Sequence, residues 1–300
     1  MIRVAILGTE NSHAKLFAGS LAPLEGEKLF PDVELIGVYG DKNTVDGQKG
    51  NEAIRKASAC PYFADSPFDF LETADVVMVT SRDGKLHLPY AREYIRRGIP
   101  VWVDKPICSS VADVEELVKL AIEHRVPLCG GSSLMHTAQV QEFAAFVRQN
   151  RDTILGGHVT APVNMVNPYG DFWFYSQHLA QMVTTVFGAD VKAVSAMETH
   201  NGVQAVYEYD RFDVTAFYGT GYSVNVYSTA GNAMCTSIQL SKDFYVPELY
   251  EMYQTVKTGE SPLNWQEYVA PVYLIDATIR AYQSGKRVEI TIPHFGEAID

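Results

Sequence analysis

The stretch IRVAILG at residues 2–8 is a short apolar run that ends at a glycine. Four further runs of similar length follow it, at residues 33–40, 75–81, 100–106 and 126–131. These runs are rich in β-branched side chains and do not alternate with polar residues, as is typical of strands buried on both faces of a parallel sheet. The sequence therefore predicts a parallel β-sheet in its N-terminal half.

Helical patterns separate these runs. Residues 109–125 begin with serines that can cap a helix and continue with apolar residues at helical spacing. Residues 86–97 have the same periodicity, and Gly98 follows them at the position where glycine commonly ends a helix. Strands that alternate with helices predict a doubly wound α/β domain with right-handed crossovers, which we place at residues 1–130.

The pattern changes after residue 130, and we expect a second domain over residues 131–300. Helices are predicted at residues 136–150, 174–186, 247–258 and 265–284. Short turns join several alternating runs, which predicts antiparallel strands in a meander. These runs lie at residues 157–164, 193–199, 203–209, 212–218, 222–228 and 233–240. The predicted second domain is therefore α+β, with a mostly antiparallel open sheet.

Length and composition exclude several classes of protein. A chain of 300 residues with 47% apolar and 20% charged residues can bury the cores of two domains and should not be disordered. The net charge of −12 argues against binding to nucleic acid or to an anionic membrane, because both need clustered positive charge. No apolar run approaches the ~20 residues that cross a membrane, and the first residues do not form a signal peptide. We therefore expect a soluble, cytoplasmic protein.

The four cysteines are far apart in the sequence. They are Cys60, Cys108, Cys129 and Cys235, with neither a CxxC pair nor a zinc-ligand spacing among them. A disulfide framework is unusual in a chain of this length. The sequence predicts isolated thiols and no metal site.

The turn after the first run is the natural cofactor loop of a doubly wound fold, because ligands bind beyond the carboxyl ends of the strands. It reads GTENSHA at residues 8–14. A dinucleotide fingerprint has glycines in the pattern G-x-G-x-x-G, and here Glu10 and His13 occupy the second and third glycine positions. Asn11 or Ser12 can cap the helix that follows. The turn by itself fits a cofactor loop or an ordinary strand-to-helix turn.

Two further strand ends carry candidate residues. Asp41 directly follows the second run, where a carboxylate can accept hydrogen bonds from a ribose and would repel a 2′-phosphate, so NAD is favoured over NADP. At the end of the run 100–106, Pro106 restricts Lys105 to extended geometry, which aims its ammonium into the crevice. A desolvated lysine can transfer protons there. The alternatives are a strand-end turn aspartate and a solvated lysine.

The second half offers a histidine at helical spacing from a tyrosine. Tyr175 and His178 lie three residues apart, on one face of the predicted helix 174–186. Histidine is the side chain best suited to move protons near neutral pH, although a packed structural histidine is more common. Side chains that could recognise a substrate in this half are Asn164, Tyr169, Asp171, Trp173 and His200.

Taken in order, these residues resemble the glucose-fructose oxidoreductase / inositol dehydrogenase (Gfo/Idh/MocA) family. Thr80, Ser81 and His87 stand where that family has a Thr-Pro-Asn…His pattern, and Asp104-Lys105-Pro106 stands for its Glu-Lys-Pro. His178 matches a histidine on the first helix of its second domain. The resemblance covers essentially the whole chain. It implies a Rossmann domain, a second domain whose open sheet forms a homodimer or homotetramer, and NAD(P)-dependent oxidation or reduction at a hydroxyl carbon of a small sugar or polyol.

The resemblance also implies roles for the candidate residues. Lys105 would be the catalytic lysine with His178 as its partner, and Asp104 would help place the nicotinamide ribose; we add Tyr175 as a hydroxyl donor. The expected NAD-binding residues are Gly8, Thr9, Asn11, Ser12, His13, Asp41, Thr80, Ser81, His87, Asp104 and Lys105. The expected substrate-binding residues are Asn164, Asp171 and Trp173.

The sequence departs from the family at three places. The glycine loop carries Glu10 and His13, and Phe174 replaces a frequent aspartate four residues before the histidine. Residues 129–134 also lack the Asn-Arg-Arg type of segment common in the family. Our main hypothesis is an NAD-dependent dehydrogenase. The alternatives are a non-catalytic relative that binds a dinucleotide or sugar, and an enzyme that uses tightly held NAD for elimination or hydrolysis.

Overall fold

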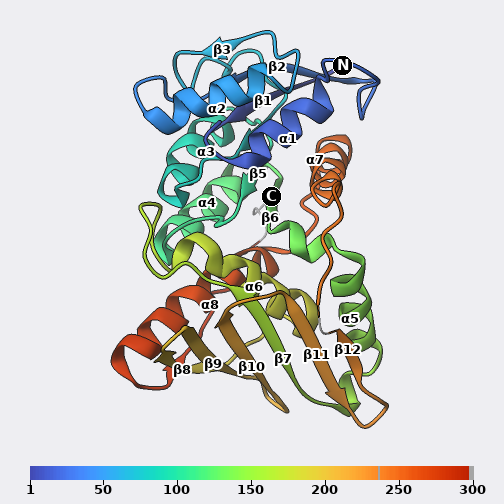
Figure 1. Cartoon of the computed structure of the whole chain (residues 1–300), viewed down its shortest axis with the longest axis vertical. Coiled ribbons are helices and arrows are strands. Elements are labelled where there is room, and N and C mark those ends of the chain that lie inside the picture. Colours follow the sequence, from blue (N-terminus) through green and yellow to red (C-terminus); the bar gives the residue numbers. More distant parts are fainter. Residues whose placement is uncertain (236, 297–300) are drawn as a thin grey trace.

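The five predicted strands of the N-terminal half lie side by side in one parallel sheet. The computed structural model of the protein describes residues 1–235 and 237–296 (Figure 1). Six strands form the first sheet in the order β3-β2-β1-β4-β5-β6, and the pairs described are parallel. They are β1 (Ile2–Leu7), β2 (Val33–Tyr39), β3 (Phe63–Ala64), β4 (Val76–Val79), β5 (Val101–Asp104) and β6 (Leu128–Gly131). The predicted parallel sheet is confirmed, with the short edge strand β3 as an addition.

Helices connect these strands, and their ends follow local chemistry. They are α1 (Ser12–Leu21), α2 (Val45–Arg55), α3 (His87–Ile95), which follows the short turn η1 (Gly84–Leu86), and α4 (Val111–His124). The Asn11 side chain caps α1, and the Ser110 hydroxyl accepts from the Asp113 amide to cap α4. The sheet order places β1 between β2 and β4, so the β1–α1 turn lies at the centre of the carboxyl edge.

The second sheet has seven strands in the order β12-β11-β7-β10-β9-β8-β13. Their bounds are β7 (Ile154–Pro162), β8 (Ala193–Thr199), β9 (Gly202–Glu208), β10 (Asp213–Gly219), β11 (Ser223–Ser228), β12 (Ala233–Cys235) and β13 (Val288–Glu289). The predicted meander holds for β8, β9 and β10. It is wrong for β7, which lies between β10 and β11 and pairs parallel with β10. After β7, a helix leads the chain to β8, near the opposite edge of the sheet. The strands β8, β9 and β10 then follow side by side, so that β10 ends up next to β7.

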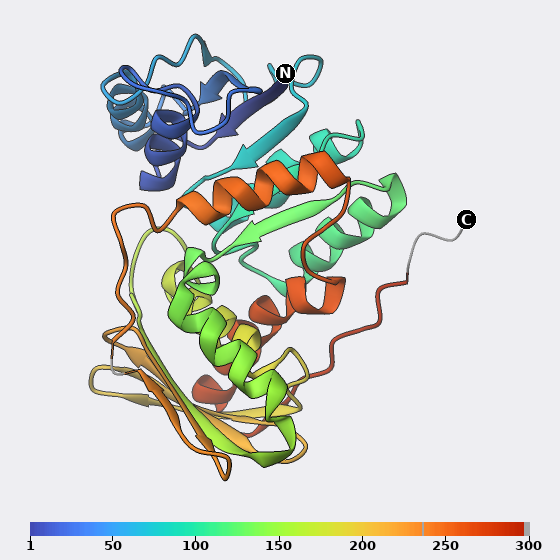
Figure 2. The same cartoon turned by 90° about the vertical axis from the view of Figure 1, so that its right-hand side faces the viewer.

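Three helices cover one face of the second sheet, the face toward the first domain (Figure 2). They are α5 (Ala138–Gln149), which follows the turn η2 (Ser133–His136), α6 (Trp173–Phe187) and α8 (Trp265–Ser284). A short turn, η3 (Arg151–Thr153), precedes β7. The predicted fold class, a doubly wound parallel domain followed by an α+β domain with a mostly antiparallel sheet, is confirmed.

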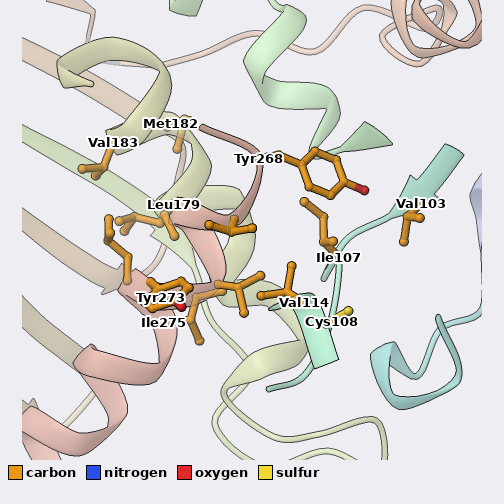
Figure 3. Close-up of a cluster of buried hydrophobic side chains, with 14 of the residues drawn as sticks. Val103, Ile107, Cys108, Val114, Leu179, Met182, Val183, Tyr268, Tyr273 and Ile275 are labelled. Carbon is orange, nitrogen blue, oxygen red and sulfur yellow. The ribbon is translucent and has the colours of Figure 1, made fainter. Parts of the chain in front are cut away.

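One apolar cluster runs from the first sheet to the second sheet through α6 and α8. Figure 3 shows Ile107 and Val114 of the first domain lying against side chains of these two helices. The other labelled members of this cluster on α6 and α8 are Leu179, Met182, Val183, Tyr268, Tyr273 and Ile275. Because this core is continuous, the position of α6 relative to the end of β5 is set by close packing.

Helix α7 (Val246–Thr258) belongs to the second part of the sequence but packs on the first sheet. Leu249 and Met252 are buried there, on the face that α1 also covers. At the other end of the helix, Lys257 Nζ lies 2.7 Å from an Asp32 carboxylate oxygen. Residues late in the chain thus return to complete the first domain. The predicted division of the chain at residue 130 stays a prediction.

Two further predictions concern the cysteine thiols and membrane-spanning helices. The thiols of Cys60, Cys108 and Cys129 are unlinked, while the Cys235 side chain lies outside the described part of the structure. Within residues 1–235 and 237–296, we find no helix with the length and hydropathy needed to span a membrane.

Truncating Met252 should destabilise the protein. The side chain is fully buried between α7 and the first sheet, so Met252→Ala removes apolar contacts and leaves a cavity. We expect the free energy of unfolding to fall by about 2–5 kcal/mol in urea denaturation. Gln254→Ala, at an exposed position of the same helix, should change it by less than about 0.5 kcal/mol. Equal, small effects of both substitutions would show that α7 is not anchored by this core.

Candidate functional site

The β1–α1 turn is built on a close backbone approach. Gly8 has φ +101°, and a Cβ atom there would lie 2.3 Å from the backbone nitrogen of Ser81. Glycine is therefore required where the end of β1 passes the end of β4. Asn11 Oδ1 accepts from the His13 amide at 3.2 Å and caps α1, while the Ser12 side chain is exposed.

The threonine side chains near this turn are buried and hydrogen-bonded within the protein. Thr9 Oγ1 donates to Asn51 Oδ1 at 2.9 Å, which links the turn to α2. Thr80 Oγ1 donates to the Gly8 carbonyl at 2.8 Å, which links it to β4. The Ser81 hydroxyl is buried, and no hydrogen-bond partner for it occurs among the described residues. The turn is thus fixed by α2 on one side and by the end of β4 on the other.

Asp104, at the end of β5, is fully buried and joins two chain segments. Its carboxylate accepts from Asn11 Nδ2 at 2.6 Å and from the Lys105 amide at 2.7 Å, and His13 Nδ1 lies 3.1 Å away. Burial acts to raise the pKa of Asp104, but the charges of His13 and Lys105 and the hydrogen bond of His13 outweigh it, so this pKa is lowered. The ionised carboxylate therefore holds the start of α1 against β5. Its contact with a ribose stays a prediction.

Lys105 points from the end of β5 toward the second domain. Its side chain is buried, and Nζ lies 4.8 Å and 5.0 Å from the ring centroids of Phe174 and Tyr175 on α6. Burial lowers the pKa of Lys105, and Asp104 opposes this shift. A lysine with a lowered pKa exchanges its proton more readily near neutral pH than a solvated one.

His178 lies on α6 and packs against the Tyr175 ring. The two ring centroids are 5.1 Å apart, and His178 Nδ1 is 2.7 Å from the Ser132 hydroxyl. Burial, helped by the charge of Lys105, lowers the pKa of His178 well below its usual value. The imidazole is therefore neutral at pH 7. The structure thus brings Lys105 and His178, predicted as partners, next to the same tyrosine ring.

Glutamine side chains of α6 set the spacing between these groups. Gln177 Oε1 accepts from the Ile107 amide at 2.7 Å, just after Lys105. Gln181 Oε1 accepts from the Ser132 amide at 2.7 Å, next to the hydroxyl that contacts His178. Both glutamines are buried. Sequence reasoning missed them because each lies within an ordinary helical pattern.

His87 and Asp41, both predicted to bind the cofactor, have hydrogen-bond partners within the protein. His87 is fully buried, with Nε2 2.7 Å from the Ser81 carbonyl and Nδ1 3.2 Å from the Ile107 carbonyl, so it ties together the segments after β4 and β5. Asp41 is half-buried, and its Oδ1 accepts from the Asn43 amide at 2.9 Å. Contact of either residue with NAD stays a prediction.

The predicted substrate residues belong to the segment 163–172 and the start of α6. Asn164 is exposed, and Trp173 is half-buried at the first position of α6. Asp171 has φ +53°, and its Oδ1 accepts from the Asn167 amide at 2.9 Å, so it shapes the loop. His200, at the turn between β8 and β9, is exposed. Contact of these residues with a substrate stays a prediction.

A carboxyl group on α7 was not predicted. Glu248 is 1% exposed, and neither of its carboxylate oxygens has a hydrogen-bond partner among the described residues. Burial, with the charges of Asp104 and Glu251, raises the pKa of Glu248 well above its usual value. The group is therefore a neutral acid beside Asp104 and Lys105. Its position in a helix late in the chain carries no sequence signal of this placement.

A second buried carboxyl on the same helix lies near a histidine. Glu251 accepts from the Gly130 amide at 2.9 Å, and its other oxygen is 3.6 Å from His136 Nε2. Burial raises the pKa of Glu251 to about 8 and lowers the pKa of His136 to about 4. Both groups are neutral at pH 7, so this close pair is not an ion pair. Within the described ranges, no group of three or more His, Cys, Asp or Glu is arranged to hold a metal ion.

Comparison with known proteins adds to this geometry. Residues 2–131 match the model of an oxidoreductase family with an NAD-binding Rossmann fold. The myo-inositol 2-dehydrogenase of Lactobacillus plantarum superposes with a TM-score of 0.81 at 14% identity, over 97% of this chain and 99% of that chain. The myo-inositol dehydrogenase of Lactobacillus casei in complex with NAD(H) and myo-inositol superposes with a TM-score of 0.78 at 12% identity, over 99% and 98%.

A third similar structure is a probable dehydrogenase from Thermotoga maritima, with a TM-score of 0.80 at 16% identity, over 96% of this chain and 98% of that chain. At these identities the likeness shows the fold. Comparison with curated protein sequences gives no match.

Replacing Glu251 by glutamine should change how stability depends on pH. In the folded chain the pKa of Glu251 is about 8, whereas an unfolded glutamate titrates near roughly 4.3. Between these values the unfolded chain has released a proton that the folded chain keeps, so the free energy of unfolding falls as pH rises. Glu251→Gln removes this fall. We expect the variant to gain about 3 kcal/mol relative to the parent between about pH 5 and about pH 8.

Urea denaturation at the two pH values measures this difference. Glu123→Gln, at an exposed position of α4, serves as the control and should leave the pH dependence of the parent unchanged. A parallel pH dependence of the parent and Glu251→Gln would contradict the assignment of a neutral carboxyl at this position.

Proposed function

We propose that the chain is an NAD-dependent dehydrogenase of a small sugar or polyol and a member of the Gfo/Idh/MocA oxidoreductase family, whose model residues 2–131 match. The observation that carries this proposal is the placement of Lys105 and His178. They come from different domains and both lie about 5 Å from the centroid of the Tyr175 ring, both buried and both with lowered pKa values. Such a pair is suited to moving the hydroxyl proton of an alcohol.

The residues around the β1–α1 turn fit a dinucleotide. Gly8 lets the backbone come close to the β4 end, and α1 begins directly behind the turn with its amides toward the carboxyl edge of the sheet. Glu10, at the second position of the glycine pattern, places its carboxylate oxygen 3.0 Å from the Arg82 amide, so this charge is satisfied by the protein. Asp41 at the end of β2 favours a free ribose hydroxyl over a 2′-phosphate, and hence NAD over NADP.

The residues of the β1–α1 turn would hold NAD at this edge, where the cofactor would supply hydride acceptance for the oxidation of a carbinol carbon. Lys105 then takes up the hydroxyl proton, and the neutral His178 ring hydrogen-bonds the same oxygen. The Ser132 hydroxyl at Nδ1 holds that ring in place, which leaves Nε2 as the nitrogen for the substrate. Tyr175 contacts both groups and supplies a further hydroxyl. The proposed oxidation of the carbinol carbon thus takes place in the space between α6 and the end of β5.

A sugar or polyol is the proposed substrate class for two reasons. Trp173, Phe174 and Tyr175 offer aromatic surface at the start of α6, and the C–H faces of cyclic sugars and inositols pack well on such surface. The similar Lactobacillus casei structure holds myo-inositol together with NAD(H). The non-catalytic alternative rests on the missing glycines and on Phe174, and the same experiment separates it from the main proposal.

Titration calorimetry and turnover test this function. We expect NADH to bind with higher affinity than NADPH, and one of a panel of inositols and sugars to be oxidised. Lys105→Met should lower kcat by about 10²- to 10⁴-fold while the affinity for NADH stays within a few fold, because it removes the proton-transfer group and keeps the stem. Lys28→Met, at an exposed lysine, is the control.

Absence of NAD and NADH binding at millimolar concentration would refute the proposal. Binding of NADH without turnover of any alcohol would favour the non-catalytic alternative. Full turnover by Lys105→Met would contradict the role given to this lysine.

We also propose that the outer face of the second sheet pairs with a second copy of the chain. Met197 is 61% exposed and Val206 36% exposed on this face, beside a cavity of about 400 Å³ that His158 and Gln204 line. Apolar side chains in such a hollow are typical of an interface between subunits.

Light scattering should therefore give the mass of a dimer or tetramer. Met197→Glu should lower that mass, because it places a charge in the interface. Leu24→Glu, which alters an exposed apolar residue of the first domain, should leave it unchanged. A monomeric parent protein would disprove the interface.

A further inference from the structure

Arg82 stands at the carboxyl end of β4, next to the β1–α1 turn. Its amide donates to Glu10 Oε1 at 3.0 Å, and its guanidinium donates to the Glu10 carbonyl. A second guanidinium nitrogen donates to the Tyr169 hydroxyl at 3.0 Å. These contacts fix the head of the arginine side chain above the turn where the glycine pattern is incomplete.

The acceptors of this guanidinium are neutral. One is a backbone carbonyl and the other is a phenol, and the Glu10 carboxylate is engaged by the backbone amide of Arg82 instead. Within the part of the chain that the structure describes, the Arg82 guanidinium forms no ion pair with a carboxylate. A half-buried cation is thus held in place with its charge available.

Tyr169 holds Arg82 from the other domain. Its hydroxyl donates to Asp46 Oδ2 at 2.5 Å, and its ring lies under the guanidinium, with Arg82 Cζ 4.9 Å from the ring centroid. Asp46 is in the first turn of α2, which follows β2, and Arg82 follows β4. Because β1 lies between these two strands, the chain Asp46–Tyr169–Arg82 crosses the sheet edge at the β1–α1 turn.

This turn is where a doubly wound fold holds the pyrophosphate of a dinucleotide. The usual pattern binds it with backbone amides that glycines leave accessible, and this chain has Glu10 and His13 in place of two of them. Two phosphate charges need compensation in a chain of net charge −12. A guanidinium fits phosphate oxygens with two parallel hydrogen bonds, which neither a glycine nor a lysine provides.

We propose that Arg82 binds the cofactor pyrophosphate and that Tyr169 is a positioning residue that orients its guanidinium. The proposal rests on the proposed NAD-dependent function and adds to it a phosphate-binding arginine that stands in for the lost glycines. Tyr169 and the Glu10 carbonyl take two of the five guanidinium N–H groups of Arg82, and the remaining N–H groups meet the phosphate oxygens. Tyr169 lies in the segment 163–172 of the second domain, so its contact with Arg82 also links this segment to the proposed cofactor site.

Titration calorimetry with NADH, ADP and adenosine tests this assignment. Adenosine carries the base and ribose of NAD without its phosphates. Arg82→Gln should weaken NADH and ADP binding by roughly 10- to 100-fold and change adenosine binding by less than about threefold, since a charged hydrogen bond is lost. Arg82→Lys should recover part of the affinity for ADP, because it restores the charge but not the planar pair of donors.

A double-mutant cycle tests the part played by Tyr169. Tyr169→Phe should weaken NADH binding by roughly three- to tenfold in the parent, and by less than about twofold in the Arg82→Gln background, because the hydroxyl acts through the guanidinium. A merely structural contribution of Tyr169 would give the same factor in both backgrounds.

The outcomes separate the two proposals. Parent protein that binds neither NADH nor ADP overturns the proposed function and this inference together. NADH binding by the parent with unchanged ADP affinity in Arg82→Gln overturns this inference and leaves the function standing. An equal loss of ADP and adenosine affinity in a variant that melts like the parent also overturns it, because the effect would then not reside in the phosphates.

Discussion

The buried carboxylate of Asp104 is the constraint on which the rest of the site depends. A charge removed from water is costly unless it is fully paired and hydrogen-bonded. Asn11, His13 and the Lys105 amide meet this demand from two different segments of the chain. The start of α1 is therefore tied to the end of β5, and the cofactor turn and the lysine are held together as one unit. Any change that loosens Asn11 or His13 would leave an unpaired charge at the centre of the site.

The second domain is joined to this unit by packing and not by a hinge. An apolar core continues from the first sheet through α6 and α8 to the second sheet. Within this core, Gln177 and Gln181 bind the segments that follow β5 and β6. These amides determine how far His178 stands from Lys105. The proposed proton transfer by Lys105 and His178, which come from separate domains, needs such rigidity, because small displacements change proton transfer strongly.

Charge is distributed unevenly in this part of the molecule. Glu248 and Glu251 are buried acids whose raised pKa values keep them neutral, while Asp104 stays ionised close by. The difference lies in the neighbouring charges and hydrogen bonds: Asp104 lies beside His13 and Lys105 and is hydrogen-bonded, whereas the oxygens of Glu248 have no partner among the described residues. The formal charge of −12 therefore overstates the negative charge that surrounds Lys105 and Arg82. Environment, more than residue type, sets the electrostatics of the crevice.

The sequence by itself determined the alternation of strands and helices, the strand ends that carry Gly8 and Lys105, and the family resemblance, because these depend on local periodicity and on residues close together in the chain. It did not determine that β7 lies between β10 and β11, that α7 returns to the first sheet, or that Tyr169 reaches Arg82. Those features come from contacts between residues far apart in sequence, whose free energy depends on how buried surfaces fit together. Tertiary structure also decided which acids are charged, since burial and hydrogen bonding act on a carboxyl only after the chain has folded.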